Sequence, residues 1–96
     1  MSKEVSKVIL IGGPEGGYIL RAFFVDDFDR EFERWLADRG LSTRQIIRPH
    51  GMIAPGFGDD VLARFAIVVN EPFSNDLAFE IRMKWDAAVY EYPDRP

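Results

Sequence analysis

Residues 26–40 alternate between apolar and charged positions with the period of an α-helix. The apolar positions follow the spacing i, i+4, i+7 and i+8, which keeps them within an arc of about 100°. They are Phe28, Phe32, Trp35 and Leu36. Asp26 or Asp27 is expected to cap the N-terminus, and Gly40 is expected to adopt a left-handed conformation just past the C-terminus. The pattern predicts one amphipathic helix that packs its apolar stripe against a sheet.

Three other segments have the composition of β-strands. Residues 5–12 and 18–25 are rich in β-branched and aromatic residues, and the Gly-Pro-Glu-Gly-Gly sequence at 13–17 predicts a hairpin turn between them. Residues 61–69 also predict a strand, although the two aspartates that precede them could instead cap a helical turn.

Residues 77–85 alternate more regularly than any other segment. One side of the alternation is apolar and consists of Leu77, Phe79, Ile81, Met83 and Trp85. This period of two predicts a strand with one buried and one solvated face. Residues 87–92 either prolong this strand or form a short last one. Residues 41–59 predict a long Pro- and Gly-rich loop, with a short edge strand at 44–48.

These segments predict an α+β fold with the element order β-β-α-(β)-β-β, in a single domain that spans residues 1–96. The architecture would be a two-layer sandwich with a four- to five-stranded, mainly antiparallel sheet and one amphipathic helix packed on one face. A helix of about 13 residues is ~20 Å long and ~10 Å across. Four to five strands form a sheet about 20–24 Å wide. One helix would therefore cover roughly half of one sheet face.

The strands contain more apolar residues than this helix can cover. In the segment 5–12, for example, Ile9 and Ile11 would lie on one face and Val8 and Leu10 on the other. Large exposed apolar patches usually mark contacts with other molecules. The second face would be covered by the 41–58 loop, by a second copy of the chain or by another protein. We expect a homodimer, because two-fold dimers are the commonest oligomers.

Composition and charge exclude several classes of protein. An apolar content of 47 % excludes a disordered chain, and the absence of cysteine excludes disulfides and thiolate metal sites. No run approaches the ~18 apolar residues of a membrane span, so we expect a soluble, cytoplasmic protein without membrane contacts. A net charge of −4 disfavours nucleic-acid binding, which usually needs a basic surface.

Candidate catalytic and metal-binding residues are few. His50 is the only histidine and could act as a general base. Ser42, Thr43 and Ser74 are possible hydroxyl partners, but no G-x-S-x-G motif accompanies them. A metal site formed by His50 with the aspartates at 59–60 would lack the usual helical spacing of ligands. The glycine-rich sequence at 12–17 lacks the Lys-Ser/Thr of a phosphate-binding loop and precedes a strand. We assign no catalytic residue, metal or cofactor.

The most suggestive cluster in this acidic chain is basic: Arg39, Arg44, Arg48 and His50. It could bind an anionic ligand, an acidic protein surface or nucleic-acid phosphates, or it could simply be a solvated edge strand whose charges prevent aggregation.

The leading hypothesis is a small, non-enzymatic protein-interaction domain. It would self-associate or dock on a larger protein through the uncovered sheet face, as an accessory or inhibitor protein. The expected contact residues are Ile19, Phe23, Val25, Arg44, Arg48 and His50. Two alternatives remain. One is a small-molecule-binding or hydrolytic domain that uses the 41–59 loop with His50 as base. The other is weak nucleic-acid binding through the basic stretch from Arg39 to His50.

Overall fold

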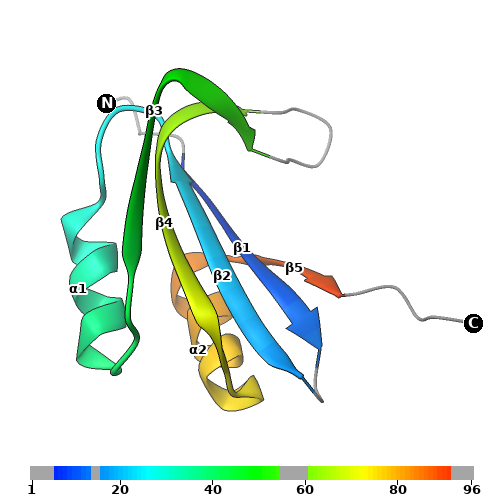
Figure 1. Ribbon diagram of the computed structural model, residues 1–96. Coiled ribbons are helices and arrows are strands. Elements are labelled where there is room, and N and C mark those ends of the chain that lie inside the picture. Colours follow the sequence, from blue (N-terminus) through cyan, green and yellow to red (C-terminus); the bar gives the residue numbers. More distant parts are fainter. Residues whose placement is uncertain (1–5, 14–15, 55–60, 92–96) are drawn as a thin grey trace, which may run out of the picture.

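A computed structural model of the chain describes residues 6–13, 16–54 and 61–91 (Figure 1). The elements are β1 (Ser6–Gly13), β2 (Gly17–Phe24), α1 (Arg30–Asp38), β3 (Arg44–Ala54), β4 (Val61–Phe73), α2 (Asn75–Trp85) and β5 (Ala88–Glu91). The fold is α+β, as predicted, but it contains two helices where the sequence pattern predicted one. The two aspartates at 59–60, considered above as a helix cap and as metal ligands, lie outside the described residues.

The five strands form one sheet in the order β3-β4-β2-β1-β5. The pairs β1–β2, β2–β4 and β3–β4 are antiparallel, whereas β1 and β5 are parallel. The sheet is therefore mixed, and the prediction of a mainly antiparallel sheet was wrong. The reason is the second helix, since it carries the chain from the end of β4 back across the sheet before β5 begins.

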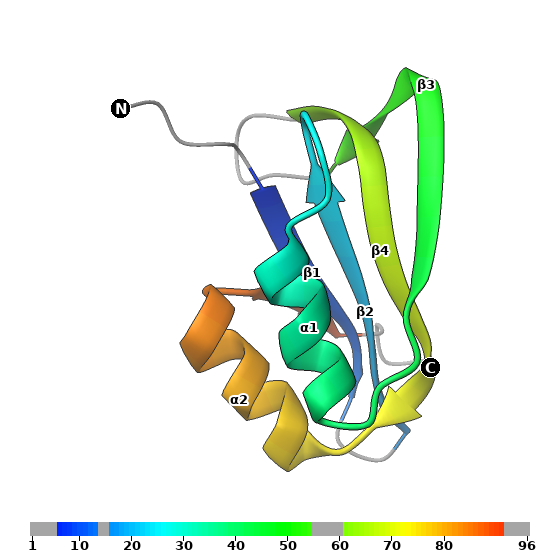
Figure 2. The same cartoon turned by 90° about the vertical axis from the view of Figure 1, so that its left-hand side faces the viewer.

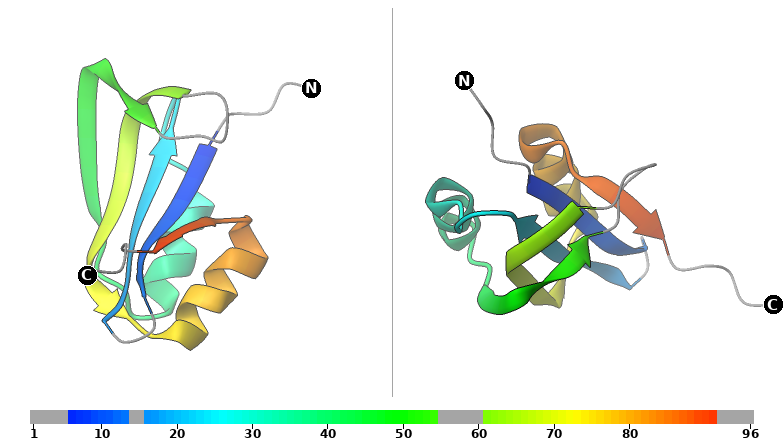
Figure 3. Two further views of the ribbon diagram at one scale, coloured as in Figure 1. Left: turned by 90° about the vertical axis from the view of Figure 1, so that its right-hand side faces the viewer. Right: turned by 90° about the horizontal axis from the view of Figure 1, so that it is seen from above.

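Both helices lie on the same side of the sheet (Figures 2 and 3). The β2–α1–β3 connection crosses β4, and the β4–α2–β5 connection crosses β2 and β1 in the opposite direction. These connections start from strands that run in opposite directions. Crossovers between parallel strands are almost always right-handed. The second connection starts from a strand of opposite direction and moves toward the opposite edge of the sheet. It therefore has the same handedness as the first connection only if its helix lies on the same face. Two right-handed crossovers therefore place both helices together and leave the other face without a helix.

Helix α1 contains Phe32, Trp35 and Leu36 of the predicted apolar stripe, but it begins later than expected and Phe28 precedes it. Its N-cap is Asp29, which accepts a hydrogen bond from the backbone N–H of Phe32 (3.1 Å), rather than Asp26 or Asp27. Phe32 and Leu36 are 1 % and 0 % exposed. Gly40 has φ +80° just beyond the helix, as its position predicted.

Residues 77–85 form most of helix α2, so the prediction of a strand there was wrong. Ser74 caps the helix by accepting a hydrogen bond from the backbone N–H of Leu77 (3.3 Å). The fully buried residues are Ala78 and Ile81, which follow helical spacing. Phe79 and Met83 belong to the apolar side of the alternating pattern, yet they are 59 % and 71 % exposed. The buried positions thus follow the helical period of 3.6 residues. The alternation of apolar and polar residue types with a period of two is coincidental.

Strands β3 and β4 are longer than predicted. Residues 44–54 form one edge strand with an irregularity between Ile47 and Met52, where the sequence predicted a short strand and a loop. Strand β4 confirms the strand at 61–69 and extends it to Phe73, so the alternative of a helical turn was wrong. Strand β5 is the short last strand that was one of two alternatives for residues 87–92.

The core lies between the sheet and the two helices. The sheet contributes alternate residues, including Leu10 from β1, Leu20 from β2 and Ile67 from β4. The helices meet through Phe32 and Trp85, whose ring centroids are 5.0 Å apart, and through Arg39. The guanidinium of Arg39 stacks 3.7 Å from the ring centroid of Trp35 and donates two 3.3 Å hydrogen bonds to the carboxylate of Glu80 on α2. This residue therefore joins the two helices across their exposed seam.

The β1–β2 hairpin should be sensitive to an added methyl group at Gly12 but not at Gly13. Gly12 has φ +148°, and a Cβ there would overlap the carbonyl oxygen of Gly17, whereas a Cβ at Gly13 would meet nothing within 4 Å. We expect Gly12→Ala to lower the free energy of unfolding by at least about 2 kcal/mol and Gly13→Ala to change it by less than ~1 kcal/mol. Urea unfolding measures both, and equal effects would contradict the hairpin geometry.

Trp85 should tolerate loss of its indole N–H better than loss of its ring. Its Nε1 is buried and has no hydrogen-bond partner among the described residues, which is unfavourable by about 1–3 kcal/mol. Trp85→Phe removes this group and keeps a ring against Phe32, so we expect a loss of stability below ~1.5 kcal/mol. Trp85→Ala should cost about 3 kcal/mol or more. Urea unfolding of the two variants tests this, and similar losses would show that the N–H is satisfied in solution.

Candidate functional site

The sheet face that neither α1 nor α2 covers, here called the open face, includes two cross-strand rows that carry cations. One row runs across all five strands and consists of Ala88, Ile9, Arg21, Val68 and Arg44. The other runs across four strands and consists of Lys7, Phe23, Ala66 and Ile46. Because side chains alternate along a strand, these residues point away from the core residues of the same strands. The register therefore brings apolar residues from all five strands together with cations.

The centre of the open face is better covered than the sequence suggested. Ile9, Ala66 and Val68 are only 2 %, 1 % and 3 % exposed. Ile19 and Phe23 remain partly exposed beside them. The most exposed apolar side chains of this face lie at one end of the β3–β4 pair, where Ile53 faces Leu62 and their exposures are 62 % and 57 %. Of the residues expected to fold over this face as a loop, 44–54 form β3 and widen the sheet, whereas 55–58 lie outside the described residues.

Every charged residue in the two rows is a cation. Lys7, Arg21 and Arg44 belong to the rows, and Arg64 shares their face by alternation along β4. None of the four forms an ion pair with another residue in the part of the chain that the structure describes. Arg44 and Arg64 are exposed, while Lys7 and Arg21 are partly buried. Their charges are therefore available to a partner.

The acidic residues gather on the other side of the molecule. The helical segments at 25–40 and 74–87 contain nine acidic and five basic residues. The five strands contain five Lys or Arg residues but only two acidic ones, Glu71 and Glu91. Glu71 lies in the irregular part of β4, and Glu91 is the last residue of β5, so neither belongs to the rows. The described part of this acidic chain thus has an acidic helical side and a basic sheet face.

The structure unites some of the predicted contact residues and separates others. Ile19, Phe23 and Arg44 share the open face. Val25 lies just after β2, partly buried in the turn that leads to α1. Arg48 and His50 are exposed on β3, beyond the point where its pairing with β4 becomes irregular. Arg48 was expected on an edge strand, whereas His50 was expected in a loop and lies on the same strand.

Sequence reasoning identified Arg44 but missed the other three cations of the open face, which are Lys7, Arg21 and Arg64. Arg21 lies between Ile19 and Phe23 in the alternating pattern, so it could have been assigned to the same face as these two residues. Lys7 and Arg64 needed the sheet order to be placed, because their neighbours come from other strands. Arg39 was grouped with Arg44, yet it joins the two helices by pairing with Glu80. The proposed basic stretch is therefore not one surface.

No hydrogen bond or ion pair joins His50 to another residue in the described part of the chain, and the aspartates at 59–60 lie outside that part. Ser74 is engaged as the N-cap of α2. Among the described residues no group of three or more His, Asp and Glu side chains comes together as a metal site would require. Helices α1 and α2 have 9 and 11 residues, too few to cross a membrane.

Comparison of the chain with models of protein families, with curated proteins and with solved structures found no match.

The charge of the open face opposes its pairing with a second copy of itself. In a two-fold dimer through this face, the four cations of one chain would approach those of the other, and like charges across an interface are unfavourable. We expect a monomer in sedimentation velocity at about 10–50 µM protein and about 50 mM salt, where screening is weak. A dimer at this salt concentration that dissociates in Phe23→Glu would contradict this expectation.

Proposed function

We propose that this chain is a non-enzymatic protein-interaction domain that docks on a larger protein through its open face, as an accessory or inhibitor protein. The observation that carries the proposal is the row in which Arg21 and Arg44 flank Val68 on a face that has no helix over it. Both arginines lack ion-pair partners among the described residues, so a bound protein could supply them.

The partner surface would combine an apolar centre with an acidic rim. Aromatic residues and arginine are enriched in the contact regions of protein interfaces, and the open face offers Phe23 with Arg21 and Arg44. A guanidinium forms bidentate hydrogen bonds with a carboxylate, which would fix the register of the two proteins. The acidic helices on the opposite side would repel the same acidic rim. The charge distribution therefore favours one docking orientation.

A second copy of the chain is a weaker candidate for the partner, because two identical basic faces repel each other. Nucleic acid is also a weaker candidate. The face is basic, but the nine acidic residues of the helical segments would oppose a long phosphate backbone. Both candidates give distinct results in the experiment that follows.

The test compares two double variants that remove the same charge from opposite sides of the molecule. Arg21→Gln/Arg44→Gln changes the open face, and Arg30→Gln/Arg34→Gln changes exposed positions on α1. The wild-type protein is used to isolate binding proteins from extracts of the cells that produce it. Each isolated protein is then purified and titrated calorimetrically with the three forms at low and high salt.

We expect the open-face variant to bind the purified partner at least about tenfold more weakly, and the α1 variant to bind within about twofold of wild type. Raising the salt concentration should weaken wild-type binding, because exposed charges are screened. Equal affinities of the two variants would contradict the proposal. Retention of nucleic acid alone, or of the chain itself alone, would also contradict it.

A further inference from the structure

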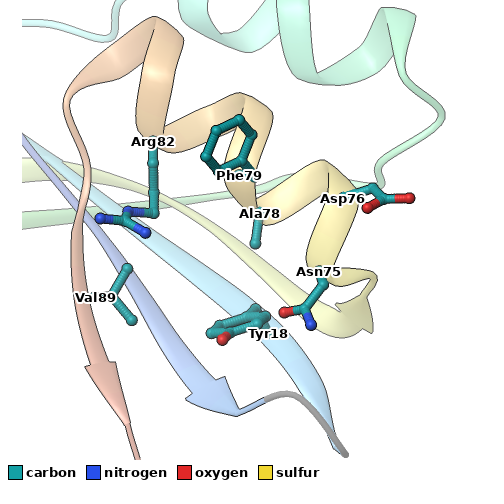
Figure 4. A pocket seen from close by; sticks show the side chains of 7 residues that line it. All are labelled: Tyr18, Asn75, Asp76, Ala78, Phe79, Arg82 and Val89. Atoms are coloured by element: carbon teal, nitrogen blue, oxygen red, sulfur yellow. The ribbon is translucent and has the colours of Figure 1, made fainter.

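A concave site lies on the helical side of the sheet and is separate from the open face. Its cavity of about 340 Å³ opens between α2, the start of β2 and β5 (Figure 4). This volume lies at the lower end of the ~300–1,000 Å³ that is typical of small-molecule sites. Helix α2 forms one wall with Ala78, Phe79 and Arg82, while Tyr18 and Val89 form the floor. The site is therefore large enough for a compound with a single ring.

The cavity contains a polar group fixed by the core. Tyr18 is only 7 % exposed, and its ring belongs to the core cluster. Its hydroxyl forms no hydrogen bond with another described residue, and it is not among the fully buried unpaired atoms, so it reaches the cavity. Figure 4 shows the amide of Asn75 directed toward Tyr18. A buried ring with an open hydroxyl is a preorganised hydrogen-bonding group.

The cavity also contains an unpaired cation. The guanidinium of Arg82 extends from α2 toward Val89 (Figure 4) and forms no ion pair with another described residue. Asp76 lines the cavity as well, but its carboxylate points away from the other side chains (Figure 4). The charge presented to a ligand is therefore positive. An arginine fork matches a carboxylate in geometry and can bind it bidentately.

The remaining lining includes the apolar side chains of an aromatic and two aliphatic residues. Phe79 lines the cavity although it is 59 % exposed, and Ala78 and Val89 lie beside it. A ring between these side chains would reduce the exposure of Phe79 and gain aromatic contact. The combination of one cation, a phenol and apolar walls matches a small planar acid.

We propose that the cavity between α2 and β5 binds a monocyclic aromatic carboxylate, with its carboxylate on Arg82, its ring against Phe79 and Val89, and a polar substituent on the Tyr18 hydroxyl. The carboxylate supplies the counter-charge that Arg82 lacks. The hydrogen bond to Tyr18 fixes the orientation of the ring. Binding is reversible and involves no covalent step. The site adds small-molecule recognition to a protein whose open face is proposed to bind another protein.

The experiment is a titration of ¹⁵N-labelled protein observed by NMR, with three probes that separate charge from shape. They are 4-hydroxybenzoate, the neutral 4-hydroxybenzamide and acetate. We expect 4-hydroxybenzoate to shift the amide resonances of Ala78, Phe79 and Val89 in a saturable manner. The amide lacks the charge and acetate lacks the ring, so each should bind at least about tenfold more weakly. Equal binding of the acid and the amide would overturn the proposal. So would the absence of a saturable shift at these residues up to about 10 mM ligand, since a site with a weaker Kd would not be specific.

Two variants test the assigned residues. Arg82→Gln should weaken binding of 4-hydroxybenzoate at least about tenfold, while Arg34→Gln, the same change at an exposed position of α1, should leave it within about twofold. Tyr18→Phe keeps the buried ring and removes the hydroxyl, so it should weaken binding several-fold without unfolding the protein. The dispersion of the NMR spectrum reports the fold of each variant. Unchanged binding in Arg82→Gln would overturn the assignment of the cation.

Discussion

The arrangement of this molecule depends on the handedness of its two crossovers. One connection leaves β2 and the other leaves the antiparallel β4, and they travel toward opposite edges of the sheet. With right-handed crossovers, both helices must lie on one face. The core then forms only between this face and the helices. A five-stranded sheet with apolar residues on both faces is consequently left with one face that no helix covers, and any function of that face follows from the topology.

The charges follow the same division. Nine acidic residues lie in the two helical segments, whereas the open face has four cations that pair with no described residue. Exposed apolar residues on a sheet face favour self-association, and charge on a sheet discourages it. If the proposed docking is correct, uniform cations would oppose contact with a second copy while attracting an acidic partner. The same residues would then keep the free protein monomeric and specify what it binds.

The sequence predicted α1 from its helical period and the strands β1, β2 and β4 from their composition, and it failed where one spacing suits two structures. The stripe of α1 fits a helical period, whereas the three strands are rich in β-branched and aromatic residues. In α2, Leu77, Ile81 and Trp85 are four residues apart, a spacing that suits both a strand and a helix. Phe79 and Met83 completed a strand pattern, yet both are exposed. The capping position of Ser74 was the available signal for a helix. The parallel β1–β5 pair could not be predicted, because it depends on that helix.

The candidate site shows why clusters of charge along a sequence are poor guides to charged surfaces. Arg39 and Arg44 are five residues apart, but the turn at Gly40 carries the chain from the helical side to the sheet edge. Arg39 stacks on Trp35 and pairs with Glu80, whereas Arg44 lies on the open face. Arg21 is far from Arg44 in sequence, yet the register separates them by Val68 alone. Alternation assigns a side chain to a face, and only the order of the strands shows which side chains become neighbours. The interacting surface is therefore a property of strand register.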